Sequence, residues 1–193
     1  LIALLPFLLL IALAIKLESR GPVLFVQERV GKDMERFAFP KFRSMTHDPK
    51  GGHEKVHRKY FRKYANGQAA DSDSEHGFKL ADDSRVTRLG KLLRRTSLDE
   101  LPQLWCVLAG KMSLVGPRPC IPYELEHYSD WHKLRFTVKP GLTGIWQVYG
   151  RSRLPMDAAQ FMDFCYVMNR SIGLNVRLIL KTFPVMIMGK GGV

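Results

Sequence analysis

The sequence predicts an α+β fold that is mainly helical and carries one small β-hairpin. Residues 23–30 are rich in β-forming side chains, a turn-like stretch follows, and residues 36–42 alternate basic with aromatic side chains. Two such runs joined by a short turn are typical of a hairpin. In residues 84–95 the apolar side chains share one helical face, and residues 158–168 and 174–188 are also expected to be helical. The 193 residues suffice for one domain with its own core.

The chain begins with an apolar run, Leu1 to Ile15, that contains no charged or polar side chain. A helix of this length would measure ~22 Å, which is less than the ~30 Å hydrocarbon core of a bilayer. Pro6 is expected to break it. A secretory signal, a spanning helix with further residues upstream, and a buried core helix are alternatives. The shortness, Pro6 and the charges after residue 15 favour a re-entrant helix that enters and leaves one leaflet.

The middle of the chain holds a polar excursion at 46–83, interpreted as a surface loop or lid with a basic helix over 54–64. A helix is expected over 97–108, with a capping box between its first residue, Ser97, and Glu100. Another is expected over 123–136. A turn-rich loop then leads to a strand-like stretch at 145–148, and residues 154–193 form apolar helices that suit a membrane interface or an ordinary core.

Composition indicates an anionic partner. The net charge is +12, which suits nucleic acid, an acidic membrane surface or a phosphorylated small molecule. The three cysteines are widely spaced and contain no Cys-x-x-Cys pair, which argues against a disulfide framework and a zinc knuckle. We expect them to be small core residues in a reducing compartment.

Two adjacent carboxylates, Asp99 and Glu100, are the first candidates for chemistry, with Arg94 before them and Arg118 between two prolines after them. Carboxylates hold a cation or attack phosphorus, and guanidinium groups hold phosphate oxygens. The alternative is that the acidic pair only caps a helix. A Pro-Arg-Pro sequence fixes the backbone on both sides of Arg118, which is more than a solvated charge needs.

Two further patterns in the sequence suggest other functions. His53-Glu54-x-x-His57 matches a zinc peptidase motif, but basic residues follow it and a short helix carries it, so solvated helix residues are favoured over a zinc hydrolase. Phenylalanines interleave with cations over 36–43, as on some single-stranded nucleic-acid platforms. The apolar start favours anionic lipid headgroups, and no nucleic acid, as the partner of these cations.

The ordered motifs together resemble the bacterial sugar transferase family, the monotopic polyprenyl-phosphate phosphoglycosyl transferases. The resemblance extends from Leu1 to about Ser152 and rests on several motifs that follow one another in order. They are Gly21-Pro22-Val23 with Gln27-Glu28-Arg29-Val30-Gly31, Lys41-Phe42-Arg43-Ser44-Met45, Arg94 with Ser97-Leu98-Asp99-Glu100-Leu101-Pro102-Gln103-Leu104, Met112-Ser113-Leu114-Val115-Gly116-Pro117-Arg118-Pro119, and Lys139-Pro140-Gly141-Leu142-Thr143-Gly144 with Gln147-Val148 and Gly150-Arg151.

The resemblance implies an Mg²⁺-dependent enzyme on the cytoplasmic face of a bacterial inner membrane. It would transfer a sugar-1-phosphate from a UDP-sugar to undecaprenyl phosphate through a covalent intermediate, release UMP and start a glycan. Residues 1–20 would form the re-entrant helix and residues 21–193 the catalytic domain, and a homodimer is suggested. The alternative function is a non-catalytic module that binds anionic lipids.

The resemblance also implies site residues. Asp99 matches the nucleophile and Glu100 its dyad partner, and both would lie at the Mg²⁺ site. Arg94 and Arg118 match phosphate-contacting positions. Lys41, Arg43, Gln147 and Arg151 would lie near the substrate or nucleotide. Cys106 stands where Asn is usual in the family, which we interpret as a packing change. Nothing in the sequence selects one sugar.

Overall fold

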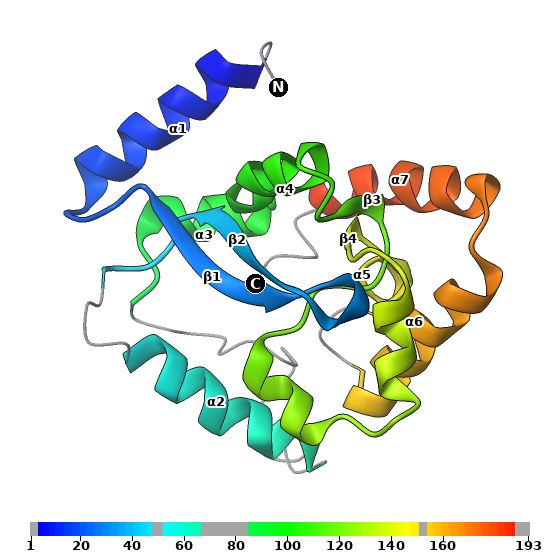
Figure 1. Cartoon of the computed structure of the whole chain (residues 1–193). Coiled ribbons are helices and arrows are strands. Elements are labelled where there is room, and N and C mark those ends of the chain that lie inside the picture. Colours follow the sequence, from blue (N-terminus) through cyan, green and yellow to red (C-terminus); the bar gives the residue numbers. More distant parts are fainter. Residues whose placement is uncertain (1–3, 48–51, 67–84, 151–153, 188–193) are drawn as a thin grey trace.

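The computed structural model describes residues 4–47, 52–66, 85–150 and 154–187 (Figure 1). Helices surround an antiparallel hairpin and a second, short pair of parallel strands. Over these residues the expected mainly helical fold with one small hairpin is confirmed. The free cysteines expected from their spacing are also confirmed, with Cys106 and Cys120 buried and Cys165 partly buried.

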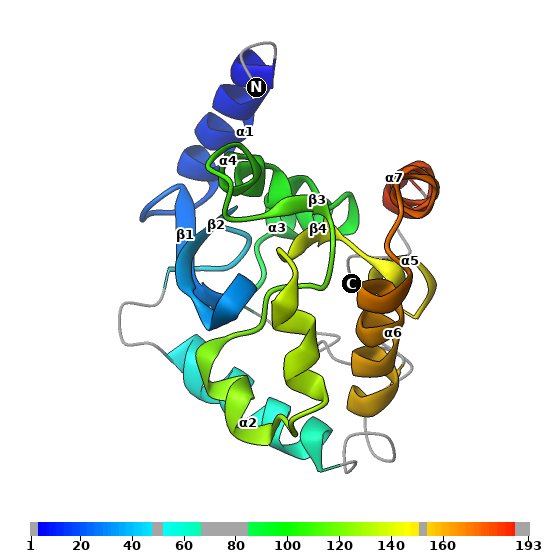
Figure 2. The same cartoon turned by 45° about the vertical axis from the view of Figure 1, so that its right-hand side comes forward.

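Helix α1 (Leu5–Glu18) extends away from the rest of the molecule, as Figures 1 and 2 show from two directions. Pro6 lies in its first turn, where the missing N–H has no helical partner to lose, and the helix continues to its end. Because residues 1–3 lie outside the described part of the chain, the predicted break at Pro6 stays a prediction. Within the described ranges, no helix combines the length and the apolar character needed to cross a membrane. Re-entrant insertion of α1 stays a prediction.

The hairpin consists of β1 (Leu24–Val30) and β2 (Arg36–Phe42), which pair antiparallel in the register that joins Val30 to Arg36. A single 3₁₀ turn, η2 (Lys32–Met34), connects them, and Asp33 adopts a left-handed conformation there. The predicted hairpin is confirmed. Its inward-facing phenylalanines pack against the segment around α4, so the hairpin is anchored to the centre of the domain.

Helix α2 (Gly52–Ala65) is the basic helix expected within the 46–83 excursion. Phe61 is buried in a cluster with Tyr123 and Tyr128, and the Tyr64 hydroxyl donates to the Leu154 carbonyl. The helix lies below the hairpin in Figure 1. The remainder of the excursion, 48–51 and 67–83, lies outside the described residues.

The centre of the fold is a run of short helices. Helix α3 (Arg88–Arg95) begins at Thr87, whose side chain accepts a hydrogen bond from the Gly90 N–H at 2.9 Å. A 3₁₀ helix, η3 (Leu98–Gln103), follows and passes directly into α4 (Leu104–Leu108). Gly90 is tightly placed, because a Cβ there would lie 2.0 Å from the Ser44 carbonyl oxygen.

The predicted capping box is wrong. Ser97 has a φ of 56° and its side chain makes no capping bond. The reason is that α3 ends at Arg95, so Ser97 reverses the chain in the left-handed region before η3 begins. What joins Ser97 to Glu100 is a bond from the Glu100 N–H to the Ser97 carbonyl, 3.2 Å long.

Two parallel strands, β3 (Ser113–Val115) and β4 (Gly141–Thr143), bring distant segments together. Between them lie two 3₁₀ helices, η4 (Pro122–His127) and η5 (His132–Thr137), where the sequence predicted one continuous helix. The chain turns at 128–131 instead, because Tyr128 leaves helical geometry at the end of η4.

The stretch predicted to be strand-like is helix α5 (Ile145–Tyr149), and the strand lies just before it. Gly144 is extended and lets the chain turn from β4 into the helix, whose bond from Val148 N–H to Gly144 C=O is 3.1 Å. Tertiary context here overrides the β propensity of the aromatic and β-branched residues. Gly141 allows close strand contact, because a Cβ there would lie 2.0 Å from the Gly116 nitrogen.

The C-terminal helices are α6 (Met156–Asn169) and α7 (Ile172–Ile187), which confirms the two predicted helices. They enclose a core in which Leu178 has no exposed surface and Tyr166 is buried. In Figure 2, α6 packs beside the segment that carries η5 while α7 lies toward the upper edge. Their placement at a membrane interface stays a prediction.

Candidate active site

The acidic pair lies in η3, against strand β2. Asp99 is buried, with 8% of its surface exposed, while Glu100 is partly buried. Both come from a 3₁₀ turn that contains Pro102 and begins at the left-handed Ser97. The tight turn therefore shields two consecutive carboxylates from solvent, whereas the first turn of a long helix would leave them solvated.

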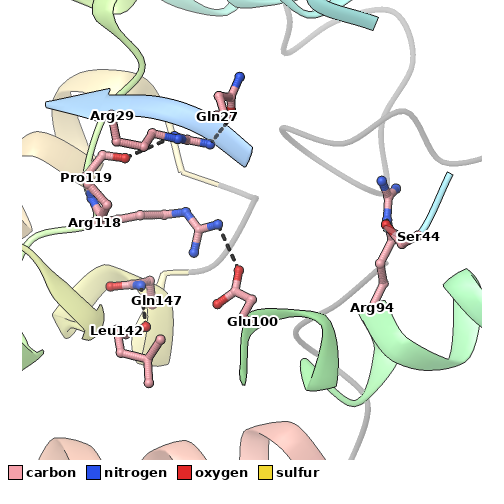
Figure 3. A network of polar contacts seen from close by, with 9 residues as sticks. All are labelled: Gln27, Arg29, Ser44, Arg94, Glu100, Arg118, Pro119, Leu142 and Gln147. Carbon is pink, nitrogen blue, oxygen red and sulfur yellow. Dashed lines mark hydrogen bonds and ion pairs between the residues drawn. The ribbon is translucent and has the colours of Figure 1, made fainter. Parts of the chain in front are cut away.

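Glu100 and Arg118 form an ion pair of 2.9 Å between Oε1 and Nη2, and Figure 3 shows the two side chains pointing toward each other. Both side chains are partly shielded from solvent. Glu100 raises the pKa of Arg118, and Asp99 and Glu124 act in the same direction. The structure thus brings together the predicted dyad and the predicted Pro-Arg-Pro arginine, which lie 18 residues apart in the chain.

Arg94 lies apart from this ion pair in Figure 3, beside Ser44. Its Nε donates to the Ser44 Oγ at 2.8 Å, which joins α3 to the end of the hairpin. Arg94 remains within electrostatic range of Lys41, as do Asp99 and Arg118. The cations expected near phosphate therefore surround one place.

Lys41 on β2 stands at the middle of this group. Its ammonium lies 5.2 Å from the centre of the Phe25 ring, the residue paired with it across the hairpin. Over the described residues, it has no hydrogen bond or ion pair. Burial, followed by Arg29, lowers the pKa of Lys41 to about 8, while Asp99 acts in the opposite direction. An anionic ligand beside this buried cation would stabilise its charged form.

Arg29 on β1 is a site residue that the sequence analysis quoted in a motif but gave no role. Its Nη1 donates to the Pro119 carbonyl at 3.0 Å and its Nη2 to Gln27 at 2.8 Å (Figure 3). Its Nε is buried and has no hydrogen-bond partner among the described residues. Burial lowers the pKa of Arg29, and Glu124 opposes this.

Glu124 on η4 is a second residue without a predicted role. It is buried, with 6% of its surface exposed. Burial raises its pKa, while Arg29, Arg135 and Arg118 act in the opposite direction. A hairpin residue and a 3₁₀-helix residue are joined here only by folding, so no local sequence signal could have paired them.

Arg43, which follows β2, contacts the end of α1. Its guanidinium donates to the carbonyls of Ser19 at 2.6 Å and Arg20 at 2.8 Å, and to the Ser19 hydroxyl at 2.9 Å. These contacts cover the C-terminal end of α1, where backbone carbonyls lack helical partners. Arg43 thus holds α1 on the domain, and its predicted place near the substrate stays a prediction.

Gln147 on α5 donates from Nε2 to the Leu142 carbonyl at 3.2 Å, and its Oε1 is buried without a hydrogen-bond partner in the described part of the chain (Figure 3). It stays a candidate for nucleotide contact. Arg151, the other predicted nucleotide residue, lies outside the described residues.

No group of three or more His, Cys, Asp or Glu residues able to hold a metal is found where the structure describes the chain. For the zinc alternative, His57 instead contacts the Tyr123 hydroxyl through Nδ1 and stacks on Phe61. Burial, together with the nearby cations Arg29 and Lys41, lowers the pKa of His57 to about 4. The described residues therefore give the zinc alternative no support.

The aromatic residues considered for nucleic-acid stacking, Phe37, Phe39 and Phe42, are all buried. Rings in a hydrophobic core cannot stack on bases. The observation removes the platform on which that interpretation rested.

Comparisons with known proteins agree with the resemblance seen in the motifs. The family model described as bacterial sugar transferase matches residues 1–189. The chain is 40% identical over 188 residues to the UDP-galactose-lipid carrier transferase of Erwinia amylovora, an alignment that covers 97% of this chain and 38% of that protein. It is 39% identical over 193 residues to the undecaprenyl-phosphate glucose phosphotransferase of Komagataeibacter xylinus, with 94% and 32% covered.

The exopolysaccharide production protein ExoY of Sinorhizobium fredii is similar over nearly its whole length. It is 36% identical over 191 residues, which covers 99% of this chain and 81% of that protein. The chain therefore spans less than half of the first two relatives and about four fifths of the third.

Proposed function

Because the chain belongs to the bacterial sugar transferase family, we propose that it transfers a sugar-1-phosphate from a UDP-sugar to undecaprenyl phosphate. The names of several relatives specify galactose, glucose or N-acetylgalactosamine as the sugar, and a lipid carrier or undecaprenyl phosphate as the acceptor. The observation that carries the proposal is the buried Asp99 beside the Glu100–Arg118 ion pair, within reach of several cations. The product would begin a glycan such as an exopolysaccharide.

The reaction divides into two displacements at phosphorus. An Asp99 carboxylate oxygen attacks the sugar-bearing phosphorus of the donor, the bond from that phosphorus to the UMP oxygen breaks, and UMP leaves with the electron pair. A phosphate oxygen of the acceptor then attacks the same phosphorus, and the Asp99 carboxylate is released. Dividing the transfer lets the soluble donor and the membrane-bound acceptor occupy the site in turn.

The surrounding cations support the binding of a diphosphate. Arg118, Lys41 and Arg94 lie around Asp99, and guanidinium and ammonium groups bind phosphate oxygens strongly. The buried Nε of Arg29, which has no hydrogen-bond partner in the described ranges, suits an acceptor oxygen. Glu100 holds Arg118 in place through their ion pair, so the charge that neutralises the transferring phosphoryl group is positioned before the donor binds.

The proposal includes Mg²⁺. Mg²⁺ is typically bound through one or two carboxylates together with substrate phosphates, so the adjacent carboxylates of Asp99 and Glu100 form a donor set of the right chemistry. Bound there, the ion would neutralise negative charge on the phosphoryl oxygens. Asp99 and Glu100 would each contribute oxygen ligands.

The exposed apolar surface supports association with a membrane. Large apolar residues are exposed on α1, α4 and α7, helices that lie along the same upper side in Figures 1 and 2. Patches of this kind mark contact with a membrane or another protein. They include Leu9, Leu10, Leu13 and Leu17 on α1, Trp105 and Leu108 on α4, and Leu180 and Phe183 on α7. Cytoplasmic-face monotopic placement, contact with anionic lipids and the suggested homodimer belong to the same proposal.

The test is the substitution Asp99→Asn, which preserves size and removes the nucleophile. We expect UMP release from a UDP-sugar panel, and labelling of the protein by radioactive donor sugar, to fall to background. Asp130→Asn is the matched control, because Asp130 is almost fully exposed and pairs with Lys133 on the surface at 2.9 Å. Full turnover in Asp99→Asn would overturn the proposal, and lipid binding without UDP-sugar turnover in the unaltered chain would favour the non-catalytic lipid module.

A further inference from the structure

The backbone that carries Arg118 is held by an unbroken row of hydrogen bonds. The carbonyl oxygens of four consecutive residues, 117 to 120, each accept a bond, and the donors come from three segments of the fold. The donors, in order, are the Gly141 N–H at 2.8 Å, the Arg135 guanidinium, the Arg29 guanidinium at 3.0 Å and the Val30 N–H at 2.9 Å.

Arg135 is the donor to the carbonyl of Arg118 itself, and it is fixed on every side. Only 6% of its surface is exposed. Its Nη1 donates to the Tyr128 hydroxyl at 2.7 Å and to Gln160 at 2.8 Å, and its Nη2 forms an ion pair of 2.8 Å with Asp163 on α6. The planar guanidinium can satisfy these directions together, which a lysine ammonium cannot.

Asp163 is the buried end of this arrangement, with 1% of its surface exposed. Burial raises its pKa, and Arg135 opposes the rise. A buried ion pair is often no more stabilising than apolar side chains of the same volume, because both charges lose their hydration. The contribution of this ion pair is to hold the Arg135 guanidinium in one position, and with it the Arg118 carbonyl that the guanidinium binds.

The contacts form one path from the C-terminal helices to the acidic pair. Asp163 on α6 holds Arg135, Arg135 holds the Arg118 carbonyl, and the Arg118 side chain meets Glu100 at 2.9 Å. One residue, Arg118, separates the buried ion pair from the dyad. A displacement of 1 Å at a catalytic group lowers a rate by about 100-fold.

We propose that Arg135, held by Asp163, is a positioning residue for the transfer reaction, which acts by fixing the Arg118 backbone and so the place of its guanidinium beside Glu100. This inference rests on the proposed phosphoryl transfer. It assigns a role in the reaction to α6, an element that contributes no residue to the predicted site.

The test is a double-substitution cycle in the full chain, with kcat/KM for UMP release as the readout. Arg135→Lys retains the positive charge but removes the planar guanidinium and its several N–H donors. We expect this change to lower kcat/KM by about 10- to 100-fold. In a chain that already carries Arg118→Lys, the same change should cost less than about threefold, because the group that it positions has been replaced. Asp163→Asn should follow the same pattern.

Equal losses from Arg135→Lys in both backgrounds would overturn the inference, because a general loss of stability acts whether or not Arg118 is present. Leu178→Val is the stability control, since Leu178 is fully buried in the core that α6 and α7 enclose. It should lower the thermal midpoint without lowering kcat/KM. A chain that releases no UMP before any substitution would contradict the proposed function instead.

A second readout needs no activity. In protein labelled with ¹⁵N-arginine, the Arg118 Nε–H signal, identified by its loss in Arg118→Lys, should shift in Arg135→Lys and in Asp163→Asn. It should not shift in Leu178→Val. An Arg118 signal that stays unchanged in both positioning variants would also overturn the inference.

Discussion

Lys41 makes the pH dependence of donor binding predictable. Its pKa is lowered to about 8, first by burial and then by Arg29. The ammonium is therefore charged below pH 8 and neutral above it, so the affinity for an anionic donor should fall as pH rises through 8. Because kcat/KM reports ionisations of the free enzyme, this quantity is the one to measure.

The magnitude follows from one charge-assisted contact. A hydrogen bond to a charged group contributes about 1.5–3 kcal/mol, which corresponds to about 10- to 150-fold in kcat/KM. We expect kcat/KM to decline above pH 8 toward a plateau lower by that factor. Lys41→Arg, whose guanidinium stays charged, should retain activity up to about pH 9.5.

The assay is UMP release at subsaturating UDP-sugar between pH 6.5 and 9.5, with Lys133→Arg as the control. Lys133 is a surface lysine paired with Asp130, so this variant should keep the decline of the unaltered chain. An identical decline in Lys41→Arg and the unaltered chain would refute the reasoning, because the titrating group would then be another one.

Two further predictions concern stability. The pKa of His57 is lowered to about 4, whereas an unfolded histidine titrates near 6.5, so the unfolded chain binds more protons between these values and stability should fall as pH drops from 6.5 toward 4. Chemical unfolding should show a loss of about 2 kcal/mol between pH 7 and 4.5 that His57→Gln, but not the exposed His47→Gln, removes. Arg43→Met should cost about 1.5–3 kcal/mol and speed amide exchange at the end of α1, because partly buried carbonyls lose a charged donor. Arg36→Met, on the exposed hairpin pair, is its control, and equal exchange in both would contradict the role of Arg43.

Much of the fold is predictable because its signals are local. The hairpin at 23–42 is encoded by β-forming residues on both sides of a turn, and α6 and α7 by apolar residues at helical spacing. The errors arise where tertiary contacts decide. Residues 145–148 favour a strand by propensity, yet the paired strand ends at Thr143 and the chain turns into a helix after Gly144.

The site residues also divide into those with a local sequence signal and those that only tertiary contacts bring together. Asp99, Glu100 and Arg118 were found because carboxylates and a Pro-flanked arginine are unusual enough to be noticed in sequence. Arg29 and Glu124 were given no role, since a cation on a β-strand and an acid on a short helix are ordinary until folding buries them together. Arg135 and Asp163 are 28 positions apart and pair only through the packing of α6, so no spacing rule applies.

The origin of the positive potential at the dyad also changes with the structure. A helix over 97–108, as the sequence predicts, would place Asp99 at its N-terminus, where free N–H groups and the helix dipole create positive potential. The observed η3 spans six residues and adds little dipole. The charge comes instead from side chains of separate segments: Lys41 on the hairpin, Arg94 on α3 and Arg118 on the loop after β3. Among these three described segments, Arg135 forms a hydrogen bond only to the one that carries Arg118, which is why Arg135 can be tested through Arg118 alone.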